Sequence, residues 1–113
     1  MINIAAVGDI MLGDHPVCFG HGIRSTMNRK GCMHFVKNVI ESLNGHEIII
    51  GNLECVISDI GINENILSSS ELRGSKESLS LLKLCGFNVL NIANNHMLQH
   101  GVDAFNDTVE IRF

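Results

Sequence analysis

The chain has 113 residues, which is room for one hydrophobic core and therefore for one domain or part of one. Hydrophobic residues make up 45% of it and charged residues 18%, a balance that argues against a disordered or coiled-coil protein. The net charge of -4, the lack of a Lys/Arg block and the presence of five aromatic residues, all Phe, argue against a nucleic-acid partner.

The ends of the chain and its cysteines bear on where the protein works. No apolar run approaches the roughly 20 residues of a membrane-spanning helix, and the first residues lack the basic flank and long apolar core of a secretory leader. Cys18, Cys32, Cys55 and Cys85 are widely spaced without a CxxC pair, which favours reduced thiols over a zinc knuckle. We therefore expect a cytoplasmic protein with no transmembrane segment in this chain.

Short apolar runs and one amphipathic stretch organise the first part of the chain. Each apolar run is too short for a helix and predicts a strand buried on both faces of a sheet. These runs are residues 2–7, 47–50 and 87–92. A helix is expected over residues 32–43, where apolar side chains recur every three or four residues, and Asn44-Gly45 ends it.

Two further helices complete an alternating pattern. One is predicted from about Ser75 to Cys85, with Gly86 in the left-handed position that follows a helix, and another begins after Gly101. The β-α-β-α-β-α order predicts an α/β fold with right-handed crossovers and a parallel sheet. The connections 8–31 and 55–74 are long for such a unit, and loops of this length are usually functional or disordered.

Polar residues follow each predicted strand, where an open parallel sheet binds its ligands. They are Asp9 after the first strand, Asn52 and Glu54 after the second, and Asn94, Asn95 and His96 after the third. We expect Asp9, Glu54 and His96 to face one shared cleft. Oxygen ligands with one imidazole and no thiolate favour a divalent ion such as Mn, Mg, Fe or Zn. Such an ion could polarise a phosphoryl oxygen and generate hydroxide near neutral pH.

Each of these residues also has a simpler interpretation when it is taken alone. An Asp after a strand often forms a turn, Asn52 and Asn94 are typical Asx-turn residues, and a lone histidine such as His96 is usually structural. Glu54 is harder to explain, because a carboxylate after an apolar run needs a cation or hydrogen-bond donors. The predicted site therefore depends on the agreement of three strand ends.

The other histidines and the common catalytic motifs add little. The histidines other than His96 are expected to be ordinary surface residues. The loop that carries His15 and His21 begins at Asp9, however, and could fold over the site. No GxSxG, P-loop, GxGxxG or HExxH motif is present, which argues against the common serine hydrolase, nucleotide, dinucleotide and zincin classes.

Three motifs at the strand ends occur in a familiar order. They are residues 7–13 (VGDIMLG), 50–54 (IGNLE) and 86–96 (GFNVLNIANNH). In order and spacing they resemble the opening motifs of the CapA family of capsule and poly-γ-glutamate synthesis proteins, and the resemblance covers essentially the whole chain. It implies a fold similar to the four-layer α/β/β/α sandwich of calcineurin-like metallophosphoesterases. Residues 1–113 would then be the N-terminal part of a single domain of this kind.

The resemblance also implies roles for individual residues. By position, Asp9, Asn52, Glu54 and Asn95 would be metal ligands, and His96 would be a general acid or a donor at the leaving oxygen.

Three positions depart from the pattern of a true phosphoesterase of this type. Met11 stands where such an enzyme has a ligand histidine, Asn52 replaces a bridging Asp, and Gln99 stands where many relatives carry an Asp. A complete two-metal site is therefore not expected from these residues.

Three functional hypotheses remain open. One is a metal-dependent hydrolase of capsule or poly-γ-glutamate biosynthesis, whose catalytic centre we expect to be completed by a C-terminal half beyond these residues. Another is a non-catalytic assembly or export accessory, associated with the membrane through the polymer synthesis machinery, or a truncated remnant with a decayed metal site. The third is a flavodoxin-like binding module. Because the resemblance places the second sheet beyond Phe113, we also expect an exposed apolar face and a homo-oligomer.

Overall fold

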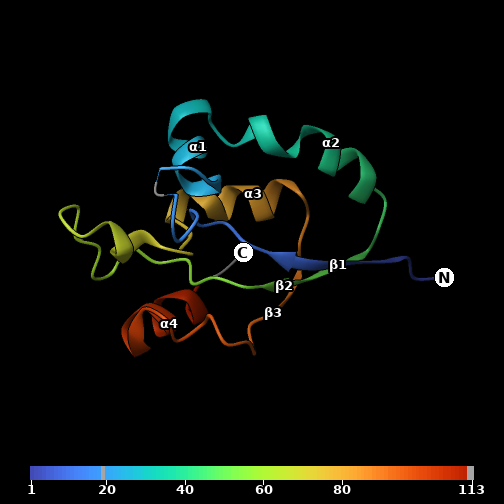
Figure 1. Ribbon diagram of the computed structural model, residues 1–113. Coiled ribbons are helices and arrows are strands. Elements are labelled where there is room, and N and C mark those ends of the chain that lie inside the picture. The colour runs from blue at the N-terminus through green and yellow to red at the C-terminus, as the bar shows by residue number, and fades with distance from the viewer. Residues whose placement is uncertain (19, 112–113) are drawn as a thin grey trace.

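A parallel three-stranded sheet forms the centre of the protein (Figure 1). The computed structural model describes residues 1–18 and 20–111. The strands are β1 (Ile4–Ile10), β2 (Ile48–Leu53) and β3 (Val89–Asn91), in the order β1-β2-β3. The predicted α/β class and the parallel pairing are confirmed, with strand boundaries that differ from the predicted ones by two or three residues at several ends.

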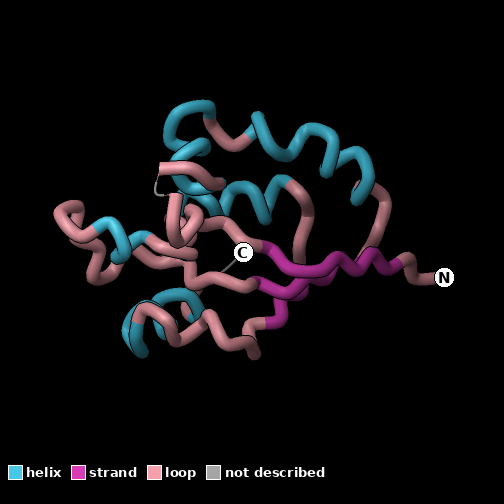
Figure 2. Tube along the Cα trace, viewed as in Figure 1, coloured by secondary structure: helices cyan, strands magenta, loops and turns pink. Residues whose placement is uncertain are grey.

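Four α-helices accompany the sheet within the described residues. They are α1 (Ile23–Lys30), α2 (Met33–Leu43), α3 (Leu79–Leu84) and α4 (Gly101–Val109). In Figures 1 and 2, α1, α2 and α3 lie together on one side of the strands, and α4 lies apart from them near the segment that follows β2. The backbone N–H of Ile57 in that segment donates to the hydroxyl of Thr108 in α4 at 3.0 Å, which ties the two together.

The helices α2 and α4 confirm the sequence prediction, whereas α1 was not predicted. Its sequence is mostly polar, and Met27 is its buried residue. The first turn of α1 depends instead on a distant carboxylate, because the backbone N–H of Ser25 donates to Oδ1 of Asp14 at 2.9 Å. An anchor of this kind leaves no apolar periodicity in the sequence.

The helix predicted from Ser75 is divided into two pieces. A 3-10 turn, η2 (Lys76–Ser78), precedes α3. The hydroxyl of Ser78 donates to the carbonyl of Ser75 at 2.5 Å, while Ser75, the expected cap, makes no capping hydrogen bond. Gly86 has a φ of 79°, as the predicted left-handed position requires.

The expectation that the strands are buried on both faces is wrong. In β2 the buried residues alternate with half-buried ones, and Ile49 and Leu53 pack with α2 and α3 in the main core. The opposite face includes Ile4, which is 60% exposed, and Val89, which is 42% exposed. The helices α1, α2 and α3 cover one face, whereas α4 lies apart beside the segment that follows β2, so the other face stays open along the strands. We call Ile4, Ala6, Ile48, Ile50 and Val89 the open sheet face; strand pairing sets them side by side.

The long connection between β2 and α3 is ordered. Ile57 pairs with Gly74 across its base, and Arg73, 2% exposed, donates from Nε to the carbonyl of Ser58 at 2.7 Å and from Nη1 to the carbonyl of Ser69 at 3.2 Å. Its Nη2 donates to the carbonyl of Ile60. One guanidinium therefore joins three carbonyls of this loop, which includes the 3-10 turn η1 (Leu67–Ser70). Across the described residues, no helix combines the length and the apolar character needed to cross a bilayer.

Candidate functional site

Polar side chains from all three strands meet at the carboxyl edge of the sheet. Asn52 lies beside Asp9 on one neighbouring strand and beside Asn91 on the other. The Nδ2 of Asn52 donates to Oδ1 of Asp9 at 2.9 Å, and the Nδ2 atoms of Asn91 and Asn94 donate to Oδ1 of Asn52 at 2.7 and 3.1 Å. We call Asp9, Asn52, Asn91 and Asn94 the strand-end row. The three strands therefore end at one edge of the sheet, as predicted, whereas a shared cleft for Asp9, Glu54 and His96 stays a prediction.

A bulge in β1 brings Asp9 into this row. The pairing of β1 with β2 shifts between Ala6 and Asp9, so that three steps along β1 match two steps along β2, from Ile50 to Asn52. Without the extra residue, Asp9 would lie on the helix-covered face, because side chains alternate along a strand. The bulge therefore places its carboxylate on the same side of the sheet as Asn52.

Asp9 is the charged member of the strand-end row. Its Oδ1 accepts the hydrogen bond from Asn52, and no hydrogen bond within residues 1–18 and 20–111 engages its Oδ2. Asp9 is exposed at the surface. It can thus offer one carboxylate oxygen to a ligand while Asn52 fixes the orientation of the other.

Glu54 and Asn95, two further candidate ligands, are close to members of the row in sequence, and no hydrogen bond between described residues joins their side chains to it. Glu54 follows β2 directly, its backbone N–H donates to the carbonyl of Ile10 at 3.0 Å, and its half-buried side chain has no hydrogen-bond or ion-pair partner in the described part of the chain. Asn95 is exposed. The donors or cation that the sequence argument required for Glu54 are not supplied by the described residues, so water or a ligand must meet that carboxylate.

His96 is held by two contacts just after β3. Its backbone N–H donates to Oδ1 of Asn94 at 3.1 Å, and its Nδ1 lies 3.0 Å from Oε1 of Gln99. The Nε2 of Gln99 donates to Oε1 of Glu71 at 3.4 Å. Because a carboxylate accepts hydrogen bonds, this contact sets the amide orientation of Gln99, and the Oε1 atom of Gln99 then accepts a hydrogen bond from Nδ1–H of His96. The Nε2 of His96 stays available for chemistry.

Two members of the row, Asn91 and Asn94, were not among the predicted ligands. Asn94 does form an Asx turn with His96, as its residue type suggests, but it also donates to the carbonyl of Leu53 at 2.8 Å. The sequence could have indicated Asn91, because it is a polar residue inside the apolar run 87–92. It lies two residues after Val89, and alternate residues of a strand face the same side of the sheet.

The long first loop lies away from the strand-end row. The Nδ1 of His15 accepts hydrogen bonds from the backbone N–H groups of Val17 and Cys18, both at 3.0 Å. His15 and His21 line a cavity beside α1 together with Met11, and Asp9 is not among the residues that line it. Met11 packs against the main core. In the described ranges, no group of three or more His, Cys, Asp or Glu side chains is gathered closely enough to hold a metal.

Comparisons with known proteins agree with the fold and with the strand-end motifs. Residues 3–112 match the family described as "Bacterial capsule synthesis protein PGA_cap". The chain is similar to the capsule biosynthesis protein CapA of Bacillus anthracis, with 29% identity over 111 residues, and to the PGA biosynthesis protein CapA of Bacillus subtilis (strain 168), with 28% identity over 109 residues.

Both alignments cover 96% of this chain but 25% and 27% of the two relatives, so the chain spans about a quarter of the length of the curated relatives it matches. The parallel α/β sheet and the match confirm the metallophosphoesterase-like fold class that the motifs implied. The family match extends from the first strand to the end of the last described helix. The chain therefore belongs to the bacterial capsule synthesis protein family PGA_cap.

Proposed function

We propose that this chain carries the strand-end part of a divalent-metal site in a phosphoester-type hydrolase of capsule or poly-γ-glutamate biosynthesis. The observation that carries the proposal is the contact between Asp9 and Asn52, which presents a free carboxylate oxygen at the carboxyl edge of a parallel sheet. The names of the two CapA relatives support the biological role.

The donor atoms near the row fit a hard divalent ion. Asp9 and Glu54 offer carboxylate oxygens, Asn95 offers a carboxamide oxygen, and the thiol of Cys55, which follows Glu54, is buried in the main core. A bound ion would supply Lewis-acid polarisation of a phosphoryl oxygen. Because Asn52 uses its Oδ1 for two hydrogen bonds, we expect weak and exchangeable binding.

The residues of the chain would orient the reacting groups. Asn52 holds the carboxylate of Asp9 in one orientation through the 2.9 Å hydrogen bond. Gln99 holds the imidazole of His96 through Nδ1, so that Nε2 can carry a proton to the leaving oxygen. Each active group is thus fixed by a neutral amide, which adds no charge of its own.

One observation favours a second candidate, a non-catalytic accessory of the polymer machinery. Met11, at the position of a ligand histidine in the phosphoesterase pattern, packs against the main core and provides no ligand at the strand ends. With Asn52 in place of an acidic residue, the row carries one negative charge, and a single carboxylate holds a metal weakly.

Metal titration together with a hydrolysis assay separates the two candidates. We expect the chain to bind Mn²⁺ in calorimetry and to hydrolyse p-nitrophenyl phosphate esters slowly. Asp9→Asn should weaken Mn²⁺ binding, and His96→Gln should slow hydrolysis while Mn²⁺ binding is kept. Asp103→Asn, an exposed carboxylate on α4, is the matched control. Mn²⁺ binding that is unaffected by Asp9→Asn would favour the accessory.

A further inference from the structure

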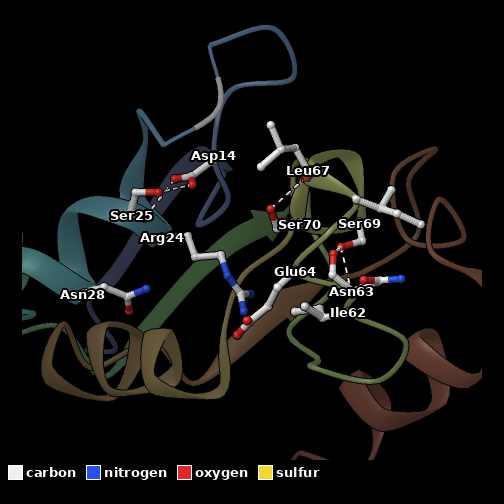
Figure 3. A pocket seen from close by; sticks show the side chains of 11 residues that line it. Asp14, Arg24, Ser25, Asn28, Ile62, Asn63, Glu64, Leu67, Ser69 and Ser70 are labelled. Atoms are coloured by element: carbon white, nitrogen blue, oxygen red, sulfur yellow. Dashed lines mark hydrogen bonds between the residues drawn. The ribbon is translucent and has the colours of Figure 1, made fainter.

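A cavity of about 300 Å³ lies between α1 and the ordered loop that contains η1, away from the strand-end row (Figure 3). Polar side chains of α1 line one wall, and the loop lines the other. The residues used below are Arg24, Ser25 and Asn28 on α1, and Asn63, Glu64 and Leu67 on the loop side. None of them belongs to the strand-end row.

The wall that α1 provides is built in advance of any ligand. Asp14 is 5% exposed, its Oδ1 accepts the backbone N–H of Ser25 at 2.9 Å, and its Oδ2 accepts the hydroxyl of Ser25. Both oxygens of this carboxylate are therefore used to fix the start of α1, and Asp14 is not free for a ligand.

The loop wall is also held by internal hydrogen bonds. The hydroxyl of Ser69 accepts the backbone N–H of Asn63 at 3.0 Å and donates to the carbonyl of the same residue at 2.9 Å. The hydroxyl of Ser70 donates to the carbonyl of Leu67 at 3.0 Å. These hydroxyls shape the cavity and have little hydrogen-bonding capacity left.

Three side chains in the cavity keep unused hydrogen-bonding groups. Arg24 donates from Nη2 to Asp59 at 2.9 Å and from Nη1 to the carbonyl of Arg73 at 3.4 Å, which uses two of the five N–H donors of a guanidinium. The side chains of Asn28 and Glu64 have no hydrogen-bond partner in the described part of the chain. The cavity therefore presents a guanidinium, a carboxamide and a carboxylate.

The charges near Arg24 favour an anionic group on that side. Arg73 is a second, buried guanidinium close by, and backbone carbonyls accept its hydrogen bonds. Burial lowers the pKa of Arg73, and the positive charge of Arg24 is the second cause of this decrease. Asp59 is the carboxylate paired with Arg24. A further carboxylate from a ligand would relieve the repulsion between Arg24 and Arg73. Glu64 offers the opposite charge on the loop side.

We propose that this cavity binds a zwitterionic α-amino acid, with its carboxylate on Arg24 and its ammonium group on Glu64. Asn28 is placed to hydrogen-bond a polar side chain, and Leu67 offers apolar contact. A volume of about 300 Å³ is at the small end of ligand pockets and suits a ligand of amino-acid size. A phosphate group would meet the negative charge of Glu64, and none of the aromatic residues in the described ranges lines the cavity for stacking on a sugar ring. The proposal does not depend on metal binding at the strand ends.

Calorimetry on the full 113-residue chain tests the site with alanine and glutamate as probes. We expect both to bind, and acetate and methylamine, which each carry one of the two charges, to bind at least roughly tenfold more weakly, as the loss of one charged hydrogen bond implies. Inorganic phosphate should not displace the amino acids. Acetate that binds as tightly as alanine, or phosphate that displaces it, would overturn the proposal.

Two variants test the two contacts separately. Arg24→Gln should weaken alanine binding at least roughly tenfold, and Glu64→Gln should do the same without disturbing the pair of Arg24 with Asp59. Lys30→Gln on the same helix and Glu41→Gln on α2 make the same charge changes outside the cavity and should have no effect. If Arg24→Gln fails to fold, Glu64→Gln still decides, because unchanged alanine binding in that variant excludes the proposed geometry.

Discussion

The carboxamide of Asn52 donates a hydrogen bond of 2.9 Å to the carboxylate of Asp9, 43 residues earlier in the chain. The contact exists because a bulge in β1 turns Asp9 onto the face that Asn52 occupies. It leaves the second carboxylate oxygen free at the edge of the sheet. The proposed metal site and the first prediction depend on this arrangement.

We expect Asp9→Ala to remove most of the bound Mn²⁺, because Asp9 is the charged residue of the strand-end row. The measurement is elemental analysis after purification in buffer that contains Mn²⁺, with Asp103→Ala as the control on α4. Stoichiometric zinc held through cysteine would contradict the prediction, because the proposed ligands are oxygen atoms.

Asn94 and Asn95 are neighbours with different expected roles. Asn94→Ala should lower the free energy of unfolding by about 1–3 kcal/mol, because the carbonyl of Leu53 and the backbone N–H of His96 lose their partner. Asn95→Ala should leave stability nearly unchanged, because Asn95 is exposed, and should weaken Mn²⁺ binding. Urea denaturation measures the first effect and calorimetry the second. Equal loss of stability in both variants would show that the Asx turn is not what holds this segment.

Gly13 lies where two backbone segments touch. A Cβ atom at Gly13 would lie 2.5 Å from the carbonyl carbon of Leu72 and would also clash with the backbone nitrogen of Arg73. Gly13→Ala should therefore cost about 3 kcal/mol or more, since backbone cannot move aside as a side chain can. Gly8→Ala is the control, because nothing lies within 4 Å of its Cβ position. Thermal unfolding followed by circular dichroism compares the two, and similar melting temperatures would contradict the close approach.

His100 should make stability depend on pH. Burial lowers its pKa, although the hydrogen bond of its Nε2 to the carbonyl of Glu71 at 2.6 Å acts in the opposite direction. The unfolded chain, with a histidine pKa of about 6.5, then binds the proton more readily than the folded chain. The contribution of His100 to the free energy of unfolding is therefore complete above a pH of about 6.5. It is lost as the pH falls below that value.

His100→Gln tests this titration. Urea denaturation at pH 7 and at pH 5 should show a smaller difference in unfolding free energy for His100→Gln than for the unchanged chain. His34→Gln, which replaces an exposed histidine on α2, should keep the full difference. A pH dependence that persists in His100→Gln would assign the effect to other groups.

The open sheet face should make the chain self-associate, because exposed apolar patches of this kind drive association. Ile4→Glu and Val89→Glu place charges on that face and should shift the chain toward monomer in light scattering at increasing concentration. Leu84→Glu, on the exposed side of α3, should not. A compact monomer with a cooperative thermal transition at every concentration tested would refute the prediction.

Local patterns in the sequence were sufficient for the three strands, for α2 and α4, and for the sheet edge at which the candidate residues gather. The apolar period of α2, the left-handed glycine after α3 and the short β-branched run that forms β2 each act over a few residues, so they can be recognised without tertiary contacts. Because parallel strands all end at one edge, polar residues such as Asp9 and Asn52 could also be predicted to meet.

Only the tertiary structure decided which polar side chains touch and which faces are covered. The bulge that turns Asp9, the capture of the first turn of α1 by Asp14, and the choice of Asn94 over Asn95 as the contact of Asn52 all depend on chain segments that are distant in sequence. The same holds for the open sheet face, since burial on both sides requires elements that pack from both sides. The spacing of apolar residues along the sequence indicates local secondary structure. These features instead follow from the strand register and from which surfaces meet in space.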